Sequence, residues 1–481
     1  MRLTAMEKYA ALNAFTHRVP QQVVLDQVMR SLESNAGSPD LRGKLVALKA
    51  NFCVKDWPSD ACSKALRGYV APFDSTVAER LRSSGAVLCG LTNMDEFGMG
   101  STGETSIHGP TINPWGAHLS CGGSSSGSAV AVATGSVFCA IGSDTGGSVR
   151  LPASHCGVVG MKPTRGAISR FGLIAYASSL DMPGIMCQNV RDVQLVLDAL
   201  AGPDNRDSTC LSSKWKLTWL QQSIKNEGIK VGLAKDFYLP ELSPSVVQAW
   251  SDGASFLANT GMDVVDGLEF PTLPDSLSAY YVIALAEASS NLARYDGVRY
   301  GHRASNTDNG NNGEPMDLHS EYAKTRTEAF GDEVQRRLLM GSLALTRRSF
   351  KTGDSSYYAM ACGVREKIRE EFRKAFEKVD VLLLPTSPFS PLKRAKAERS
   401  EDEDVTKGYV EDTMTVPASL AGLPAISVPA RLCGETGGPI GLQVIGRAGQ
   451  DGTVLRVAEI LERGFNFVPF TASGKAPPTV G

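Results

Sequence analysis

GGSSSGSA at residues 122–129 and SDTGGSVR at residues 143–150 are the two stretches that decide the fold. Ser148 lies 24 residues after Ser124 and 99 residues after Lys49. Hydrolysis of an amide needs a nucleophile, a base that later returns a proton to the leaving amine, and donors for the tetrahedral oxyanion. A serine, a lysine and a glycine-flanked backbone can supply these three functions. Lys49, Ser124 and Ser148 are therefore candidate catalytic residues.

The second stretch predicts an oxyanion hole. Two glycines directly before Ser148 let the backbone turn tightly and present successive N–H groups beside the hydroxyl, with no Cβ in the way. The donors would be the amides of Thr145, Gly146, Gly147 and Ser148 itself. Taken alone, Gly-Gly-Ser is also an ordinary turn sequence. The neighbouring motifs favour the oxyanion hole.

The first stretch joins a loop to a helix. It follows Asn113-Pro114-Trp115, a loop signal, and it precedes 128–134, which reads as a helix with small side chains. A flexible linker is the alternative for 122–127, but a linker would not run straight into an apolar helix. Lys49 ends the apolar strand 45–48, so its amine is expected in a site poor in water, where its pKa falls. A solvated lysine at a strand end is the alternative.

Together these motifs resemble the amidase-signature family. The resemblance extends from about Leu41 to Ala201. It rests on Lys49 and the two serine-rich stretches, and three further motifs within it point to a subfamily: Asn93–Phe97, Cys156–Thr164 and Ser178–Asp181. The resemblance implies an α/β fold in which one mixed central sheet is covered by helices on both faces.

The resemblance also implies roles for the three candidate residues. Ser148 would be the nucleophile, Ser124 would follow a cis peptide bond and relay the proton, and Lys49 would be the base. Two positions depart from the family pattern, because Ala50 stands where aspartate is usual and Ser126 where glycine is usual. Neither change removes a catalytic group, but they affect the surroundings of Lys49 and of the Ser124 loop.

The quoted motifs are similar to the subfamily that acts in tRNA-dependent amidation. A thinner likeness continues through Tyr280–Gly301, Gly331–Gly341 and Tyr409–Gly446. It implies a glutamine pocket made by Tyr280, Arg337 and Asp412. Arginine would pair with the α-carboxylate and aspartate with the α-ammonium of glutamine. Plain surface charge is the alternative for Arg337 and Asp412.

This resemblance implies partners. The chain would hydrolyse glutamine and pass ammonia to a B-type subunit, which amidates Glu-tRNA(Gln) to Gln-tRNA(Gln) with ATP. A small third subunit, of type C or of the fungal F type, would complete the complex. The chain itself would hold no cofactor, and ATP, Mg and most tRNA contacts would belong to the partner. The short region ahead of Leu12 resembles fungal mitochondrial versions, so the mitochondrial matrix is expected, with a bacterial cytoplasm as the alternative.

Composition agrees with a globular enzyme. The 481 residues are 42% hydrophobic and 21% charged, and the net charge of −2 offers no global attraction to nucleic acid. Ten scattered cysteines without a C-x-x-C pair suggest reduced thiols. Six scattered histidines give no metal-ligand spacing, and neither a P-loop nor a Rossmann glycine pattern is present. No segment reads as a membrane span.

The alternation of short apolar runs and amphipathic segments indicates an α/β fold. The resemblance implies a single domain over residues 1–481, with its core at about 41–465. A disordered insertion is expected at 301–320, a charged loop at 393–407 and a loose tail at 471–481. Asn189 is expected to begin a helix over 190–200 as its N-cap, and Gly202 to end it as its C-cap. Strands are expected at 87–91, 137–142, 229–234, 381–385, 425–428 and 440–445. Further helices are expected at 76–84, 246–260, 276–294, 363–378 and 453–463.

Three other functions fit parts of the sequence. Residues 123–127 match G-x-S-x-G with Ser125 as a hydrolase nucleophile, which would need His155, His302 or His319 to complete a triad. Ala50 and Ser126 motivate a scaffold role without catalysis. The closer alternative is a stand-alone amidase for small or aryl amides.

Overall fold

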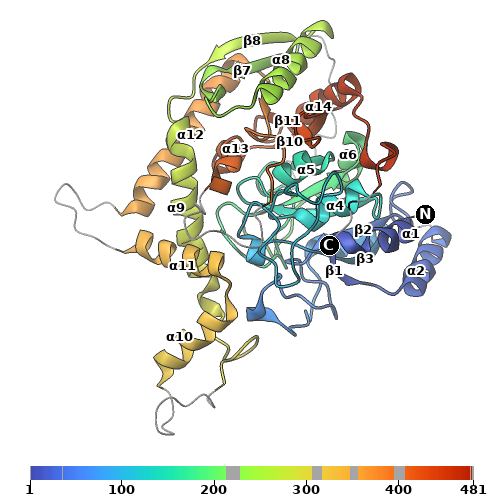
Figure 1. Ribbon diagram of the computed structural model, residues 1–481, viewed down its shortest axis with the longest axis vertical. Coiled ribbons are helices and arrows are strands. Elements are labelled where there is room, and N and C mark those ends of the chain that lie inside the picture. Colours follow the sequence, from blue (N-terminus) through green and yellow to red (C-terminus); the bar gives the residue numbers. More distant parts are fainter. Residues whose placement is uncertain are drawn as a thin grey trace.

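The computed structural model describes residues 2–34, 36–212, 228–305, 317–346, 356–394, 407–476 and 478. Their strands form one eleven-stranded mixed sheet in the order β1-β3-β2-β4-β6-β5-β10-β11-β9-β7-β8. Helices surround the sheet, with β7, β8 and α8 at one end and α1, α2 and β1 at the other (Figure 1). The expected α/β fold with a mixed central sheet is confirmed.

The strands have these bounds: β1 Phe15–Arg18, β2 Leu45–Lys49, β3 Val87–Thr92, β4 Cys139–Asp144, β5 Val159–Lys162, β6 Met182–Cys187, β7 Lys230–Ala234, β8 Asp263–Leu268, β9 Val381–Pro385, β10 Ala425–Leu432 and β11 Pro439–Gly446. The helices are α1 Arg2–Lys8, α2 Gln21–Glu33, α3 Thr76–Ser83, α4 Ser126–Ala133, α5 Arg150–Cys156, α6 Val190–Leu200, α8 Pro244–Asn259, α9 Leu273–Asn291, α10 Leu318–Ala329, α11 Asp332–Leu345, α12 Tyr357–Lys378, α13 Val416–Ala421 and α14 Asp451–Phe465.

Strand β2 lies between two parallel neighbours. Leu48 pairs with Leu91 of β3 and with Ile141 of β4, and every residue of these three strands is buried. Because parallel strands end at the same edge of a sheet, Lys49 at the end of β2 reaches the edge where β4 delivers Ser143. The pairing of β2 with β4, which lie far apart in sequence, thus brings Lys49 and Ser143 together.

Helix α4 packs against β2, β3 and β4, and all of its residues are buried. Its small side chains permit this close approach. A Cβ on Gly127 would lie 2.4 Å from the carbonyl oxygen of Ala14, so the helix could not sit as deep with a larger residue there. The N-terminus of α4 thereby holds the serine-rich loop against the carboxyl ends of the central strands.

Helices α9, α11 and α12 lie beside the sheet in the left part of Figure 1. Helices α9 and α11 pack closely because Gly341 has no side chain. A Cβ there would lie 1.9 Å from the carbonyl oxygen of Leu285. This packing brings Arg337 on α11 near the tyrosines of α9.

Most expected elements are present, with ends shifted by a few residues. Asn189 caps α6 as predicted, since its side chain accepts from the Asp192 N–H. The expectation for Gly202 is wrong, because α6 already ends at Ala201 in an extended conformation and Gly202 donates to Ala167 instead. Strands β1, β5, β6 and β8 were not expected.

Two of the three expected irregular segments fall largely outside the described residues, whereas most of the expected tail at 471–481 is described and starts in a short helix, η7 Phe470–Ala472. Positions 306–316 and 395–406, which make up most of the predicted insertion and charged loop, are not described, and α10 begins at Leu318, inside the predicted insertion. The single-domain assignment stays a prediction. Among the described helices, none is long and apolar enough to cross a membrane.

Candidate active site

Lys49 is fully buried at the end of β2 and touches two serines. Its Nζ lies 2.7 Å from Ser124 Oγ and 2.9 Å from Ser143 Oγ. Burial lowers the pKa of Lys49 to about 7, although Asp95, Asp144 and Asp181 oppose this shift. An appreciable fraction of Lys49 is therefore neutral near neutral pH and can accept a proton from Ser124.

Ser124 stands in a loop that is fixed from both sides. The Gly123–Ser124 peptide bond is cis, as the resemblance implied. The Asp95 N–H donates to the Ser124 carbonyl at 3.2 Å, and the Ser125 N–H donates to the Ser148 carbonyl at 3.2 Å. A Cβ on Gly123 would lie 2.0 Å from Asp95 Oδ2, so this position accepts no side chain. The contact between Ser125 and Ser148 joins the two serine-rich stretches in space.

A buried ion pair holds the turn that carries Ser148. Arg150 Nη2 lies 3.0 Å from Asp144 Oδ1, and both side chains are inaccessible to solvent. Arg150 Nη1 also donates to the Thr415 carbonyl at 2.8 Å. Burial would raise the pKa of Asp144, but the guanidinium of Arg150 lowers it overall below its usual value. The turn between β4 and α5 is thus anchored at both ends, and Ser148 is 9% exposed.

The predicted oxyanion donors line this turn. The N–H groups of Gly146, Gly147 and Ser148 donate to no atom of the described residues. A Cβ on Gly146 would lie 2.5 Å from Tyr280 Cζ, and one on Gly147 would lie 2.2 Å from Thr415 Oγ1. Both positions therefore require glycine, and the amides remain available to an oxyanion. Thr145 belongs to the same turn, and its hydroxyl donates to Asp181 Oδ1 at 2.8 Å.

The three predicted pocket residues come from α9, α11 and the short helix η6, Lys407–Asp412. Tyr280 packs on the oxyanion turn through Gly146. Its neighbour Tyr281 donates through its hydroxyl to Asp412 Oδ2 at 3.2 Å, and the Arg337 guanidinium lies 5.5 Å from the centre of the Tyr281 ring. Arg337 and Asp412 thus meet on the same tyrosine.

The two charged residues of the pocket are buried, so plain surface charge does not describe them. Arg337 is 4% exposed and Asp412 is 8% exposed. Burial raises the pKa of Asp412 to about 7, while Arg337 acts in the opposite direction. Arg337 Nε donates to Glu333 Oε1 at 2.7 Å, which gives the guanidinium a local counter-charge.

Several residues of this site were missed by the sequence reasoning. Ser143 binds Lys49, Glu333 and Tyr176 bind Arg337, and Tyr409 stacks on Tyr281 with ring centres 4.4 Å apart. Tyr409 begins one of the segments used for the resemblance. The other three carried no signal beyond their residue type, since their roles depend on contacts across the fold.

The two departures from the family pattern are accommodated. Ala50 is buried, and its N–H donates to the Thr92 carbonyl at 3.0 Å. Ser126 is buried, and its hydroxyl donates to Thr111 Oγ1 at 3.0 Å. Neither residue contacts Lys49 or Ser124 through a side-chain hydrogen bond within the described part of the chain. The lysine instead receives its support from Ser143.

The hydrolase alternative built on Ser125 does not fit this geometry. The Ser125 side chain is fully buried, and its hydroxyl donates to the Ser143 carbonyl at 3.2 Å. His302 pairs with Glu328 at 2.9 Å, and His155 Nε2 lies 3.9 Å from Glu411 Oε1. His319 lies in the first turn of α10. No histidine in the described ranges hydrogen-bonds to Ser125.

One cluster of potential metal ligands lies outside this site. Across the described ranges, Asp60, Cys62 and His108 place ligand atoms within 4.8 Å of one another. His108 Nε2 lies 2.7 Å from Asp60 Oδ2, and Cys62 Sγ donates to Asn93 Oδ1 at 3.5 Å. Each side chain therefore has a protein partner. That the chain holds no metal of its own stays a prediction.

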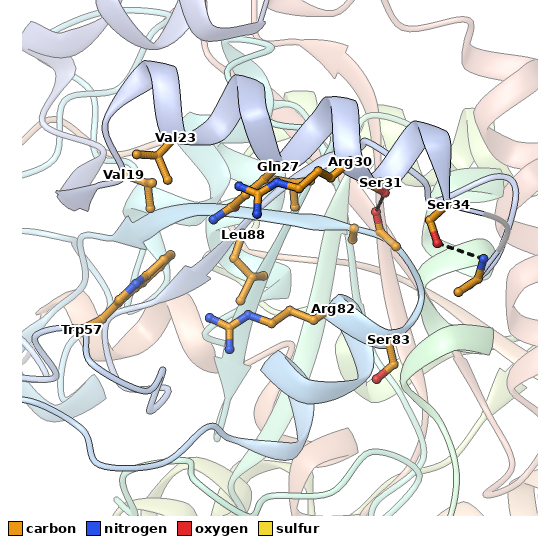
Figure 2. Close-up of a pocket in the computed structure, with 14 residues that line it drawn as sticks. Val19, Val23, Gln27, Arg30, Ser31, Ser34, Trp57, Arg82, Ser83 and Leu88 are labelled. Atoms are coloured by element: carbon orange, nitrogen blue, oxygen red, sulfur yellow. Dashed lines mark hydrogen bonds between the residues drawn. The ribbon is translucent and has the colours of Figure 1, made fainter.

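A separate cavity of about 460 Å³ lies between α2, β3 and α3 (Figure 2). It is lined by residues that include Val19, Val23, Trp57, Arg82 and Leu88. None of the predicted catalytic or pocket residues lines it.

The ten cysteines, all within the described ranges, are free thiols.

A buried lysine amine in contact with a serine hydroxyl, beside a glycine-bordered serine, is an arrangement that suits amide hydrolysis. The Amidase family matches residues 3–455, and the chain belongs to this family. Among its relatives, the A-type subunit of glutamyl-tRNA(Gln) amidotransferase from Synechococcus sp. (strain WH7803) is 45% identical over 441 residues, which cover 91% of this chain and 86% of the relative. The protein of the same description from Methanosarcina mazei is 43% identical and covers 94% of this chain and 89% of the relative.

A solved structure agrees with these relatives. The A-type subunit of glutamyl-tRNA(Gln) amidotransferase from Thermotoga maritima is 33% identical, with a TM-score of 0.74. The alignment covers 96% of this chain and 90% of that one. The chain therefore matches proteins of this description over nearly their whole length.

Proposed function

We propose that the chain is the glutamine-hydrolysing subunit of a glutamyl-tRNA(Gln) amidotransferase. The contact that carries the proposal is the 2.7 Å distance between the buried Lys49 amine and Ser124 Oγ. It supplies a base and a relay next to the turn that presents Ser148. The relatives of the same description and the buried Arg337 and Asp412 support glutamine as the substrate.

The reaction proceeds through an ester. Ser148 Oγ attacks the side-chain amide carbon of glutamine, while its proton passes to Ser124 and the Ser124 proton passes to neutral Lys49. The free N–H groups of the turn stabilise the oxyanion. The proton then returns through Ser124 to the leaving nitrogen, the carbon–nitrogen bond breaks, and ammonia departs. Water hydrolyses the γ-glutamyl ester and releases glutamate.

The partners in this proposal follow from the relatives' description and from the resemblance in sequence. A B-type subunit would bind ATP, Mg and most of the tRNA, and a small C-type or F-type subunit would complete the complex. The mitochondrial matrix remains the proposed compartment. Ammonia would pass from Ser148 to the B-type subunit without entering bulk water.

Reconstitution tests this function. The chain is combined with its copurifying subunits, and formation of Gln-tRNA(Gln) from Glu-tRNA(Gln) is measured with glutamine and ATP. Product should require this chain when glutamine is the nitrogen donor. Hydrolysis of aryl amides by the isolated chain, without activity in the reconstituted complex, would favour a stand-alone amidase instead.

Arg337→Ala is expected to raise the KM for glutamine by roughly 10²-fold or more, because the carboxylate loses a charge-assisted partner in a buried site. Steady-state glutaminase assays measure this change. Arg336→Ala is the matched control, since Arg336 neighbours it in sequence but its side chain is 38% exposed. An unchanged KM in Arg337→Ala would mean that the α-carboxylate binds elsewhere.

A further inference from the structure

The Tyr176 hydroxyl is part of the Arg337 subsite. Arg337 Nη1 donates to Tyr176 Oη at 3.0 Å, and Tyr176 is 3% exposed. Arg337 is the one hydrogen-bond partner of this hydroxyl among the described residues. The opposite side of the guanidinium is held by Glu333. Glu333, on the same helix α11, holds Nε of Arg337, and Tyr176 holds Nη1 from outside that helix.

The backbone of Tyr176 is tied to the oxyanion turn through Asp181. The N–H groups of Tyr176 and Ala177 donate to Asp181 Oδ2 at 2.8 and 2.9 Å. The other oxygen, Oδ1, accepts from Thr145 Oγ1 at 2.8 Å. Asp181 is 2% exposed, so water competes little for these bonds.

Sheet register explains why Asp181 meets Thr145. Strands β4 and β6 are antiparallel, and Asp144 pairs with Met182. The next residue of β4 and the preceding residue of β6 therefore leave the sheet side by side. Thr145 and Asp181 occupy these two positions, which fixes their contact through the fold and not through a flexible loop.

We propose that Tyr176 and Asp181 are positioning residues that link the carboxylate end of the glutamine pocket to the oxyanion turn. The inference rests on the proposed function and deepens it. When Arg337 binds the α-carboxylate, it orders Tyr176 and the segment from Tyr176 to Asp181. Asp181 in turn orders Thr145 in the oxyanion turn. Part of the binding energy of this remote group then raises turnover as well as affinity.

The link adds to a second contact between the pocket and the turn. Tyr280 packs directly on Gly146, which restricts the turn by shape alone. The Tyr176–Asp181 route is different, since its contacts between residues are hydrogen bonds between buried groups. It can therefore respond to whether the Arg337 guanidinium is occupied by a carboxylate.

Tyr176→Phe tests the link because it removes the hydroxyl and keeps the ring. Hydrolysis is measured in the assembled complex with glutamine and with 4-aminobutanamide, which has the same amide and ammonium but no carboxylate. We expect kcat for glutamine to fall roughly tenfold, the value of about one hydrogen bond. The kcat for 4-aminobutanamide should stay within about twofold. Tyr238→Phe makes the same change on a half-exposed tyrosine stacked on Trp250, and it should alter neither rate.

A double-mutant cycle gives a second readout that uses glutamine alone. In an Arg337→Ala background, Tyr176→Phe should have no further effect on kcat, because the hydroxyl acts through the guanidinium. Asp181→Asn should lower kcat for both substrates, because it contacts the oxyanion turn directly.

Two results would overturn the inference while the proposed function stands. One is an equal loss of kcat with both substrates in Tyr176→Phe, and the other is a rise in KM with kcat unchanged. A wild-type complex without glutaminase activity would overturn the proposed function and, with it, this inference.

Discussion

Ser148→Ala is expected to lower glutamine hydrolysis by at least about 10⁴-fold, because it removes the proposed nucleophile from the glycine turn proposed to stabilise the oxyanion. The fold should survive, since the Ser148 side chain makes no hydrogen bond within the described residues. In the reconstituted complex, free ammonium at high concentration should restore formation of Gln-tRNA(Gln). The measurements are glutamate release, thermal unfolding and tRNA amidation with each nitrogen donor.

Ser125→Ala is the matched control for the nucleophile. It removes a buried hydroxyl from the neighbouring stretch, and ester formation on Ser148 should continue. Mass measurement of the trapped acyl-enzyme identifies the residue that carries it. A γ-glutamyl group on Ser125 or on a cysteine would contradict the assignment, as would failure of ammonium to rescue an assembled Ser148→Ala complex.

Lys49→Arg is expected to lower kcat by roughly 10²- to 10⁴-fold, the range of general acid–base catalysis. Arginine keeps its proton at all accessible pH values and cannot take one from Ser124. Lys162→Arg is the matched control, because Lys162 is also fully buried and burial likewise lowers its pKa to about 7. Its amine binds the Leu423 carbonyl and makes no hydrogen bond to Ser124 or Ser148 within the described residues. Turnover within about tenfold of wild type in Lys49→Arg would exclude the relay.

The pH dependence has a defined sign. The pKa of Lys49 is lowered to about 7, so the neutral amine, and with it kcat, should rise as pH increases through this value. The pKa of Asp412 is raised to about 7, so the carboxylate that binds the α-ammonium also forms over this range, and this should lower KM. Steady-state profiles separate the two contributions. A kcat that falls as pH rises from about 6 to about 8 would contradict a lysine base.

The fold could be predicted where short apolar runs alternate with amphipathic segments. Strands β3, β9 and β11 were expected within one or two residues of their bounds because Val, Ile and Leu dominate them. Strand β6 was missed, since MPGIMC contains a proline and a glycine that usually interrupt strands. The sheet tolerates both residues there, and Gly184 is required because its Cβ would lie 2.7 Å from Val149 Cγ2.

The site was predictable where chemistry depends on local sequence. Lys49, Ser124 and the Thr145–Ser148 turn stand in short motifs, and the structure gathers them at the carboxyl ends of β2 and β4. Ser143 and Tyr176 were missed because their functions arise from β2–β4 pairing and from the contact with α11. No spacing along the chain records those distances. The catalytic roles themselves stay predictions until the variants are measured.

The site is divided along the chain in a way that bears on how its specificity can change. Lys49, Ser124 and Ser148, the proposed base, relay and nucleophile, all stand before residue 150 on the central strands and their loops. Tyr280, Arg337 and Asp412, the residues proposed to bind the far end of the substrate, stand after residue 279, on α9, α11 and η6. Substitutions in this later segment can alter which amide enters without replacing Lys49, Ser124 or Ser148. A protein with this arrangement can thus acquire new substrates through substitutions in the later segment while it keeps the residues of the earlier segment.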